Sequence, residues 1–348
     1  MTRDASGAVL PMRRCKDFPP DATFRDRCPR HYADFVQMLD ACLPEYMHPT
    51  DGALNLAGAL PPDCVPPDLG PKGYIAFGRE AEHEGEGDSV TKLHEDISDA
   101  INILCHVQCC PAGGLAGAAT AAAGAAAAAA DADAGPASSS PLAPPLPPPP
   151  LPVPRCGSTP AAAPSYGGAG AVWDLFLRAD LPALRRFLQD ALDGAIPGLP
   201  PFVHSGVDLA SGEVRILDVV HDQCFYLTAA HRAVLAERYG VHSWHVEQYE
   251  WEGVVIPAGS AHQVRNLRAC IKVALDFVSP ESVGECMKLR EEFRRLAKGE
   301  APTAEALAAE EDVGDRHFHD KLQAANMVLA GMARALETLE QAAEEEAA

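Results

Sequence analysis

The stretch WHVEQYEWEGVVIPAGSAHQVRNLRACIKVALDFV, residues 244–278, decides the fold class of this chain. Polar and apolar residues alternate before Pro257, and they alternate again in CIKVALDF at 270–277, which is the pattern of half-buried strands. Pro257, Ala258 and Gly259 form a tight-turn signal between two of the predicted strands. We therefore expect a sheet-rich domain at this place in the chain.

Helical periodicity flanks this strand-rich patch on both sides. Upstream, leucines recur at the spacing of an amphipathic helix over 172–192, so we predict one or two helices there. A further helix is expected over 225–239, ended by Gly240, and another over 279–297. The tail, 303–348, is predicted to be an acidic helix.

Apolar residues of this tail repeat every three and four positions from Leu322 to Leu339, which is a heptad seam. Two interpretations remain open. The tail is either a short coiled coil that self-associates through 318–339, or a surface helix that packs on its own domain.

A low-complexity insert interrupts the globular sequence. Residues 111–171 are mostly Ala, Gly, Pro and Ser, and they include only three charged side chains. Such a composition offers almost no large apolar groups to offset the entropy of ordering, so we predict a disordered insert. The predicted organisation is one domain in two parts, 14–110 and 172–298, separated by this insert and followed by the tail.

The overall charge limits the partners of the chain. There are 28 Lys and Arg residues against 49 Asp and Glu residues, which gives a formal net charge of -21. Because affinity for phosphates depends on clustered cations, direct sequence-specific DNA binding is not expected, whereas basic peptides suit this charge. No apolar run reaches membrane-spanning length, and no signal peptide follows Met1, so the eleven cysteines are expected to be reduced intracellular thiols.

Two His-x-acid pairs raise the question of a metal site. Non-haem iron oxygenases use two imidazoles and one carboxylate on one face of the ion. His94-x-Asp96 lies in the alternating segment LHEDISDAINI, where residues i and i+2 of a strand would point to one side. With thirteen histidines in 348 residues, about two such pairs are expected by chance, and His245-x-Glu247 is the second. Spacing alone therefore does not identify the site.

Two later residues could complete such a site. His262 follows the VVIPAGSA strand and turn, where a third ligand would be expected, although a hairpin histidine that only hydrogen-bonds its neighbours is the more frequent case. Lys272 lies in the alternating run CIKVALDF, and a lysine there must reach either water or an anion. We interpret Arg185-Arg186 and Arg294-Arg295 as solvated helix faces and the cysteines at 105, 109 and 110 as structural thiols.

Five blocks in order resemble one known family. They are CKDFPPDATFRDRCPRHYADFVQMLD (15–40), LNLAGALPPDCVPPDLGPKGYIAFG (54–78), LHEDISDAINIL (93–104), HDQCFYL (221–227) and YGVHSWHVEQYEWEGVVIPAGSAHQVRNLRACIKVALDFVSPE (239–281). Together they resemble the Jumonji C (JmjC) domain of the hairless-type subfamily, which includes demethylases of lysine 9 of histone H3. The resemblance covers residues 14–298 apart from the insert.

The resemblance implies a mainly β fold with flanking helices, a double-stranded β-helix or cupin-like jelly roll. It implies Fe(II) held by His94, Asp96 and His262, with 2-oxoglutarate as cosubstrate and O2 as oxidant. Thr91 matches a threonine that contacts 2-oxoglutarate in relatives, although simple alternation would turn Lys92 inward instead. Asn102 and Lys272 are the further candidates for binding the cosubstrate. The implied partners are a methylated histone H3 tail and chromatin-associated proteins, and the implied location is the nucleus.

One departure from the family pattern keeps alternatives open. Many JmjC enzymes carry a cosubstrate lysine about seventeen residues after the first ligand, and this sequence has Pro111 there. Lys272 would then be the anchor, or cosubstrate binding would be weakened. Two rival functions therefore stand beside histone demethylation: a protein hydroxylase that uses the same site, and a corepressor scaffold with little or no catalysis.

Overall fold

The computed structural model describes residues 14–40, 44–49, 52–64, 67–78, 89–108, 168–202, 216–297 and 322–347. The predicted insert is almost entirely outside these residues, as are Cys109, Cys110 and Pro111. The description below concerns the larger of the two units into which the chain divides, which excludes 108–168.

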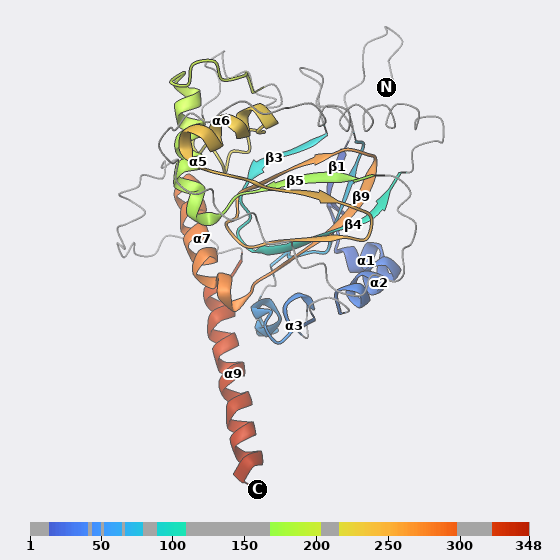
Figure 1. Ribbon diagram of the computed structural model, residues 1–348. Helices are drawn as coiled ribbons and strands as arrows, with labels where there is room; N and C mark the ends of the chain where they lie inside the picture. The colour runs from blue at the N-terminus through green and yellow to red at the C-terminus, as the bar shows by residue number, and fades with distance from the viewer. Residues whose placement is uncertain are drawn as a thin grey trace, which may run out of the picture. The chain divides into compact units, whose positions relative to one another are not determined.

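Two antiparallel sheets form the centre of the larger unit (Figure 1). The first has the strand order β1-β2-β9-β4-β7 and the second the order β3-β8-β5-β6. The strands are β1 (Arg14–Phe18), β2 (Lys72–Ala76), β3 (Val90–His94), β4 (Asp99–Val107), β5 (Ala171–Leu175), β6 (Trp244–Gln248), β7 (Gly253–Ile256), β8 (His262–Asn266) and β9 (Cys270–Phe277). The sequence-predicted sheet-rich domain is therefore present, and its strands after residue 244 are β6 to β9.

The inner faces of the sheets share one apolar cluster. Ala100 on β4 and Ile256 on β7 meet Trp173 on β5 and Val264 on β8. Successive residues of a strand face opposite ways, so the other face of β9 presents Val273, Leu275 and Phe277 to a second cluster under the helices. The two faces of β9 thus separate a helix-covered core from the interior between the sheets.

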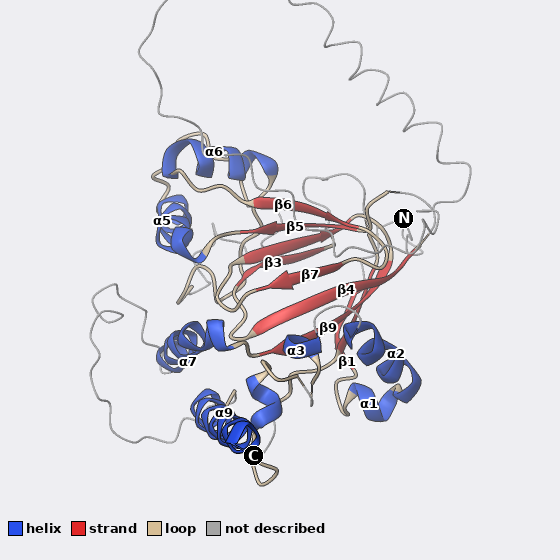
Figure 2. Cartoon of the chain, turned by 60° about the horizontal axis from the view of Figure 1, so that its bottom comes forward, coloured by secondary structure: helices blue, strands red, loops and turns tan. Residues whose placement is uncertain are grey.

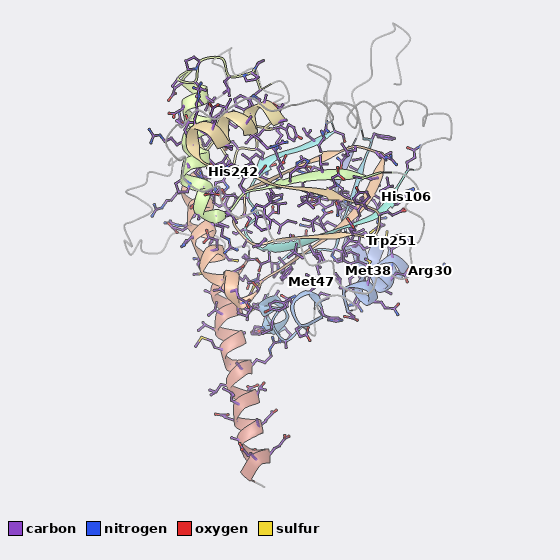
Figure 3. All side chains as sticks on the ribbon, viewed as in Figure 1. Arg30, Met38, Met47, His106, His242 and Trp251 are labelled. Atoms are coloured by element: carbon purple, nitrogen blue, oxygen red, sulfur yellow. The ribbon has the colours of Figure 1, made fainter. Side chains whose placement is uncertain are left out.

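Helices lie at two sides of the strands, as Figures 1 and 2 both show. They are α1 (Phe24–Arg27), α2 (Pro29–Asp40), α3 (Pro44–Met47), α5 (Leu181–Leu192), α6 (Ala229–Tyr239), α7 (Val283–Ala297) and α9 (Ala324–Ala347), with 3-10 turns η1 (Leu56–Ala59), η2 (Arg178–Asp180) and η3 (Pro280–Ser282). Phe35 and Leu39 of α2 and Met47 of α3 cover the first sheet. Met47 is labelled in Figure 3. Leu184, Phe187 and Leu188 of α5 pack with Leu235 of α6.

Two of the predicted helices begin later than expected. Residues 171–175 form the strand β5, because Trp173 pairs with both β6 and β8 and is buried between the sheets. The helix predicted from the leucine spacing begins only at Leu181, as α5. The helix expected from 225 begins at Ala229 instead, since Phe225 to Leu227 are buried in extended chain and Thr228 caps the helix. Its predicted end is confirmed, with Gly240 at φ 69°.

The turn at Pro257-Ala258-Gly259 is also confirmed, but it joins strands of different sheets. β7 pairs with β4 in the first sheet, and β8 pairs with β3 and β5 in the second. Buried Asp99 accepts the backbone N–H of Ala258 at 2.8 Å and that of Ser279 at 2.9 Å. One carboxylate therefore fixes the chain just before β8 and just after β9.

The tail helix combines features of both sequence interpretations. Leu322, Ala324 and Met327 are buried against the domain, whereas Leu329, Met332, Leu336 and Leu339 of the heptad seam are each 57–68% exposed. The start of α9 thus packs on its own domain, and self-association through the remaining seam stays a prediction. Within the described residues, no helix has the length and apolar character needed to cross a bilayer.

A candidate metal and cosubstrate pocket

His94, Asp96 and His262 converge at one end of the space between the sheets. One ligand atom from each lies within 4.8 Å of the others. Asp96 places its two carboxylate oxygens 3.7 Å from His94 Nε2 and 3.5 Å from His262 Nε2. The second sheet brings the histidines together, because His94 at the end of β3 pairs directly with His262 at the start of β8.

Asp96 reaches the site by a different route from the one expected. β3 ends at His94, so Asp96 lies in the loop before β4 rather than two residues along one strand. That loop is held by the backbone, since Gly259 N–H donates to the Asp96 carbonyl at 3.0 Å. Asp96 shares the site with the histidines because the loop turns back toward β8.

Both imidazoles are oriented by backbone carbonyls. His94 Nδ1 lies 2.7 Å from the Lys92 carbonyl, and His262 Nδ1 lies 3.0 Å from the Ser260 carbonyl. A carbonyl oxygen only accepts, so each Nδ1 donates and each Nε2 of a neutral ring offers a lone pair toward Asp96. Burial, followed by the neighbouring His262, lowers the pKa of His94 to about 4, which keeps this ring neutral at pH 7. Two imidazoles and one carboxylate are the donor set that suits a divalent iron ion.

A pocket of about 290 Å³ extends from these three side chains, and Thr91, Asn102 and Lys272 also line it. Thr91 faces the pocket because the β3–β8 register shifts between Thr91 and His94, so simple alternation does not apply. Asn102 Oδ1 is buried without a hydrogen-bond partner, which suits a polar ligand. The structure therefore brings all six sequence-predicted site residues to one pocket.

Lys272 is buried rather than extended to the surface. Its ammonium donates to Asn266 Oδ1 at 2.7 Å and lies 5.3 Å from the ring centre of Trp173. The other neighbour of this indole is His262, whose ring centre is 6.0 Å away. Burial lowers the pKa of Lys272 to about 8, so the side chain is still mainly cationic at pH 7. A buried ammonium without a carboxylate partner favours an anionic ligand.

The pocket wall also carries carboxylates. Asp276 follows Lys272 and Ala274 on the same face of β9, and Asp17 accepts a hydrogen bond from the Tyr74 hydroxyl at 2.8 Å. Burial, and then the nearby Asp96, raises the pKa of Asp276 to about 7. The pocket thus has a cationic group at Lys272 and a carboxyl group at Asp276.

The other His-x-acid pair belongs to no such site. His245 Nδ1 lies 2.8 Å from Asp174, which also binds Arg232 at 2.8 Å. His245 belongs to β6, at the end of the strand order of the second sheet, and is half-exposed. Its carboxylate partner is part of a structural ion network between β5 and α6.

Sequence interpretation missed a buried ion cluster behind the candidate ligands. Arg185, which we expected on a solvated helix face, contacts Glu95, Asp218 and Glu292, whereas Arg186 is 78% exposed as expected. Burial raises the pKa of Glu95 to about 7, and Arg185 opposes this shift. Only the position of Glu95 between His94 and Asp96 could have drawn attention to it. Arg294 and Arg295 were also expected in solvent, yet both are largely buried on Glu291.

Comparisons with known proteins point in one direction. Residues 217–277, which include His262 and Lys272, match the family description "JmjC domain, hydroxylase". The chain is 38% identical over 299 residues to the lysine-specific demethylase JMJ29 of Arabidopsis thaliana, a match that covers 86% of this chain and 32% of that protein. It is 36% identical over 296 residues to lysine-specific demethylase 3 of Drosophila melanogaster, covering 84% and 29%. It is 33% identical over 285 residues to the mouse lysine-specific demethylase 3A, covering 82% and 18%. The chain thus spans a third or less of the length of these relatives.

Proposed function

Because this chain is a JmjC-domain protein, we propose that it is a 2-oxoglutarate-dependent oxygenase that demethylates histone lysine, with lysine 9 of histone H3 as the preferred residue. The observation that carries the proposal is the convergence of His94, Asp96 and His262 in the pocket that also holds Lys272. The proposal includes action on chromatin in the nucleus, in line with the demethylase names of the relatives.

The donor set fits Fe(II), which His94, Asp96 and His262 would hold through two imidazole nitrogens and a carboxylate. When bound, the metal supplies the redox chemistry that couples 2-oxoglutarate and O2 to oxidation of an N-methyl group. The chain contributes preset ligands, since the Lys92 and Ser260 carbonyls hold both rings in one orientation. Preset ligands need little rearrangement to bind the ion.

Three residues would hold the cosubstrate. The Lys272 ammonium would pair with the distal carboxylate, and Asn266 keeps that ammonium in place. Asn102 can offer either its oxygen or, after a half-turn of the amide, its N–H groups, while Thr91 offers a hydroxyl. In this assignment Lys272 replaces the lysine that many JmjC enzymes carry at the position of Pro111, which lies outside the described residues.

The substrate end of the pocket suits a cation. A methylated lysine is positively charged, and Asp276 and Asp17 line the same pocket. The net charge of -21 would also attract the basic tail of a histone. In the overall reaction, 2-oxoglutarate and O2 yield succinate and carbon dioxide, one oxygen atom enters the N-methyl C–H bond, and the hydroxymethyl product releases formaldehyde and the less methylated amine.

A turnover assay tests this proposal. The full chain with iron, ascorbate and 2-oxoglutarate is incubated with histone H3 peptides methylated at lysine 9 or at another lysine, and succinate, formaldehyde and peptide mass are measured. We expect formaldehyde in proportion to succinate, with the lysine 9 peptide preferred and no turnover by His262→Ala. A peptide that gains one oxygen atom without formaldehyde would identify a hydroxylase. Absence of succinate would leave the scaffold function.

A further inference from the structure

A buried cluster of charged side chains lies directly behind the candidate metal ligands. At its centre is Arg185 of α5, whose guanidinium contacts Asp218, lies 3.4 Å from Glu95 Oε1 and lies 3.5 Å from Glu292 Oε2. His221 Nε2 lies 3.2 Å from the same guanidinium and 3.1 Å from Glu292. The Glu95, Asp218 and His221 side chains are at most 3% exposed, whereas Arg185 is 25% exposed, so solvent screens the buried side of this cluster only weakly.

The cluster is connected to the metal site through the main chain of one short segment. Glu95 stands between His94 and Asp96, but its side chain is absent from the pocket wall that these two residues share. Neighbouring side chains on extended chain point to opposite sides, so Glu95 enters the cluster while His94 and Asp96 enter the pocket. The cluster therefore holds the ligand-bearing segment from behind.

The same cluster fixes a second part of the pocket wall. Asp218 accepts the backbone N–H groups of Val220 and His221, each at 2.8 Å. This tight turn leads to Gln223, which lines the pocket with φ at 53°. Arg185 thus joins the segment that carries two ligands to a loop that forms part of the pocket.

Charge makes Arg185 indispensable to this arrangement. Three carboxylates, those of Glu95, Asp218 and Glu292, meet the single guanidinium of Arg185. A buried carboxylate that loses its cation partner moves toward water or neutralises, because an unpaired buried charge is costly. We expect the segment 94–96 to move first, because strand β3 ends at His94 and the residues that follow it lie in a loop.

We propose that Arg185 is a positioning residue for the metal site, and that it sets the relative placement of His94 and Asp96 through its contact with Glu95. The inference rests on the proposed metal site. Arg185 and Glu95 point away from the pocket, so neither can bind the metal directly. Both would act on metal affinity by positioning the ligands. Outer partners of metal ligands typically change affinity by about 10- to 100-fold.

The test is a Co(II) titration of the metal-free full chain, followed by the visible absorption of the bound ion. We expect Glu95→Gln and Arg185→Gln to weaken Co(II) binding by about 10- to 100-fold and to alter its absorption bands. Arg186→Gln is the matched control, because this neighbour on the same helix is exposed and pairs with Asp190 rather than with the cluster. Arg185→Lys should recover part of the affinity, since a lysine restores the charge but not the planar contacts.

A separate variant distinguishes positioning from general stability. Glu292→Gln removes a cluster carboxylate on α7, far along the chain from the ligands, and it should change the midpoint of thermal unfolding without changing Co(II) affinity. Equal losses of affinity in Glu292→Gln and Glu95→Gln would overturn the proposal. Should Arg185→Gln fail to fold, Glu95→Gln decides the question, because it leaves Arg185 paired with two carboxylates.

The outcome also separates this inference from the proposed function. If native protein binds no Co(II), the metal site itself is wrong. If native protein binds Co(II), His262→Ala does not, and both Arg185→Gln and Glu95→Gln bind normally, only the positioning role is wrong.

Discussion

The ammonium of Lys272 and the side-chain oxygen of Asn266 are 2.7 Å apart, and they come from different sheets. Lys272 belongs to β9 and Asn266 to β8, so this hydrogen bond links the two sheets. It fixes a buried cation at a defined place relative to His262, the first residue of β8. The proposed cosubstrate anchor and His262, one of the proposed metal ligands, therefore lie on two consecutive strands joined by this hydrogen bond.

Loss of this cation should weaken cosubstrate binding. A charge-assisted hydrogen bond contributes about 1.5–3 kcal/mol, so Lys272→Met should raise the KM for 2-oxoglutarate by about 10- to 100-fold. The control is Lys288→Met, because Lys288 is an exposed lysine on α7. Succinate formation at varied 2-oxoglutarate measures the effect, and an unchanged KM in Lys272→Met would exclude Lys272 as the anchor.

The same residue predicts a pH dependence. Burial lowers the pKa of Lys272 to about 8, so its ammonium is present below pH 8 and is lost as pH rises through that value. The kcat/KM for 2-oxoglutarate should fall above pH 8, and Lys272→Arg, which stays protonated, should lack this fall. A profile from pH 6.5 to 9.5 with saturating peptide provides the measurement. An identical fall in both proteins would assign it to another group.

Two histidines offer a matched test of the metal site. His262→Ala should abolish Co(II) binding, because it removes one of three ligands, whereas His245→Ala should leave it intact. Equilibrium dialysis of the metal-free chain measures both stoichiometries. Equal Co(II) content in the two variants would contradict the assignment of His262.

Asp99 should be a stability residue rather than a site residue. Asp99→Ala leaves the buried N–H groups of Ala258 and Ser279 without acceptors, at a cost of about 1–3 kcal/mol each. Urea unfolding should therefore show a loss of about 2–4 kcal/mol, and Asp99→Asn, which keeps an oxygen acceptor, should lose less. A similar loss in both variants would mean that charge rather than hydrogen bonding matters here.

Asp276 predicts a pH effect on stability with a defined sign. Its pKa rises from 3.8 to about 7 in the fold, mainly through burial, so the protonated acid is the form that the fold prefers. This preference contributes stability below pH 4 that is lost as pH rises through about 7. The change in unfolding free energy caused by Asp276→Asn is measured in metal-free protein at pH 5 and at pH 8. It should be more favourable at pH 8, by about 1 kcal/mol or more. A pH-independent difference would show that Asp276 ionises freely.

The strands from 244 onward were predictable because their own alternation reports which face is buried. β5 was not, since its burial comes from β6 and β8, which lie far along the chain, and a run of apolar residues at 172–177 fits a helix as well as a strand. The six site residues were found through the resemblance, because chance produces His-x-acid pairs as often as they occur here. Arg185 was missed because its partners Asp218, Glu95 and Glu292 are 33, 90 and 107 residues away.

Sheet order also has a consequence for how the polypeptide emerges from the ribosome. β1 and β2 pair with each other, whereas within the described part of the chain β3 pairs with β8 alone and β4 with β7 and β9 alone. At about 5–20 residues per second, the segments that carry His94 and Asn102 wait on the order of ten seconds or more before their partners are synthesised. During this interval unpaired strand edges are exposed, so early chaperone engagement should decide how much active protein a cell obtains.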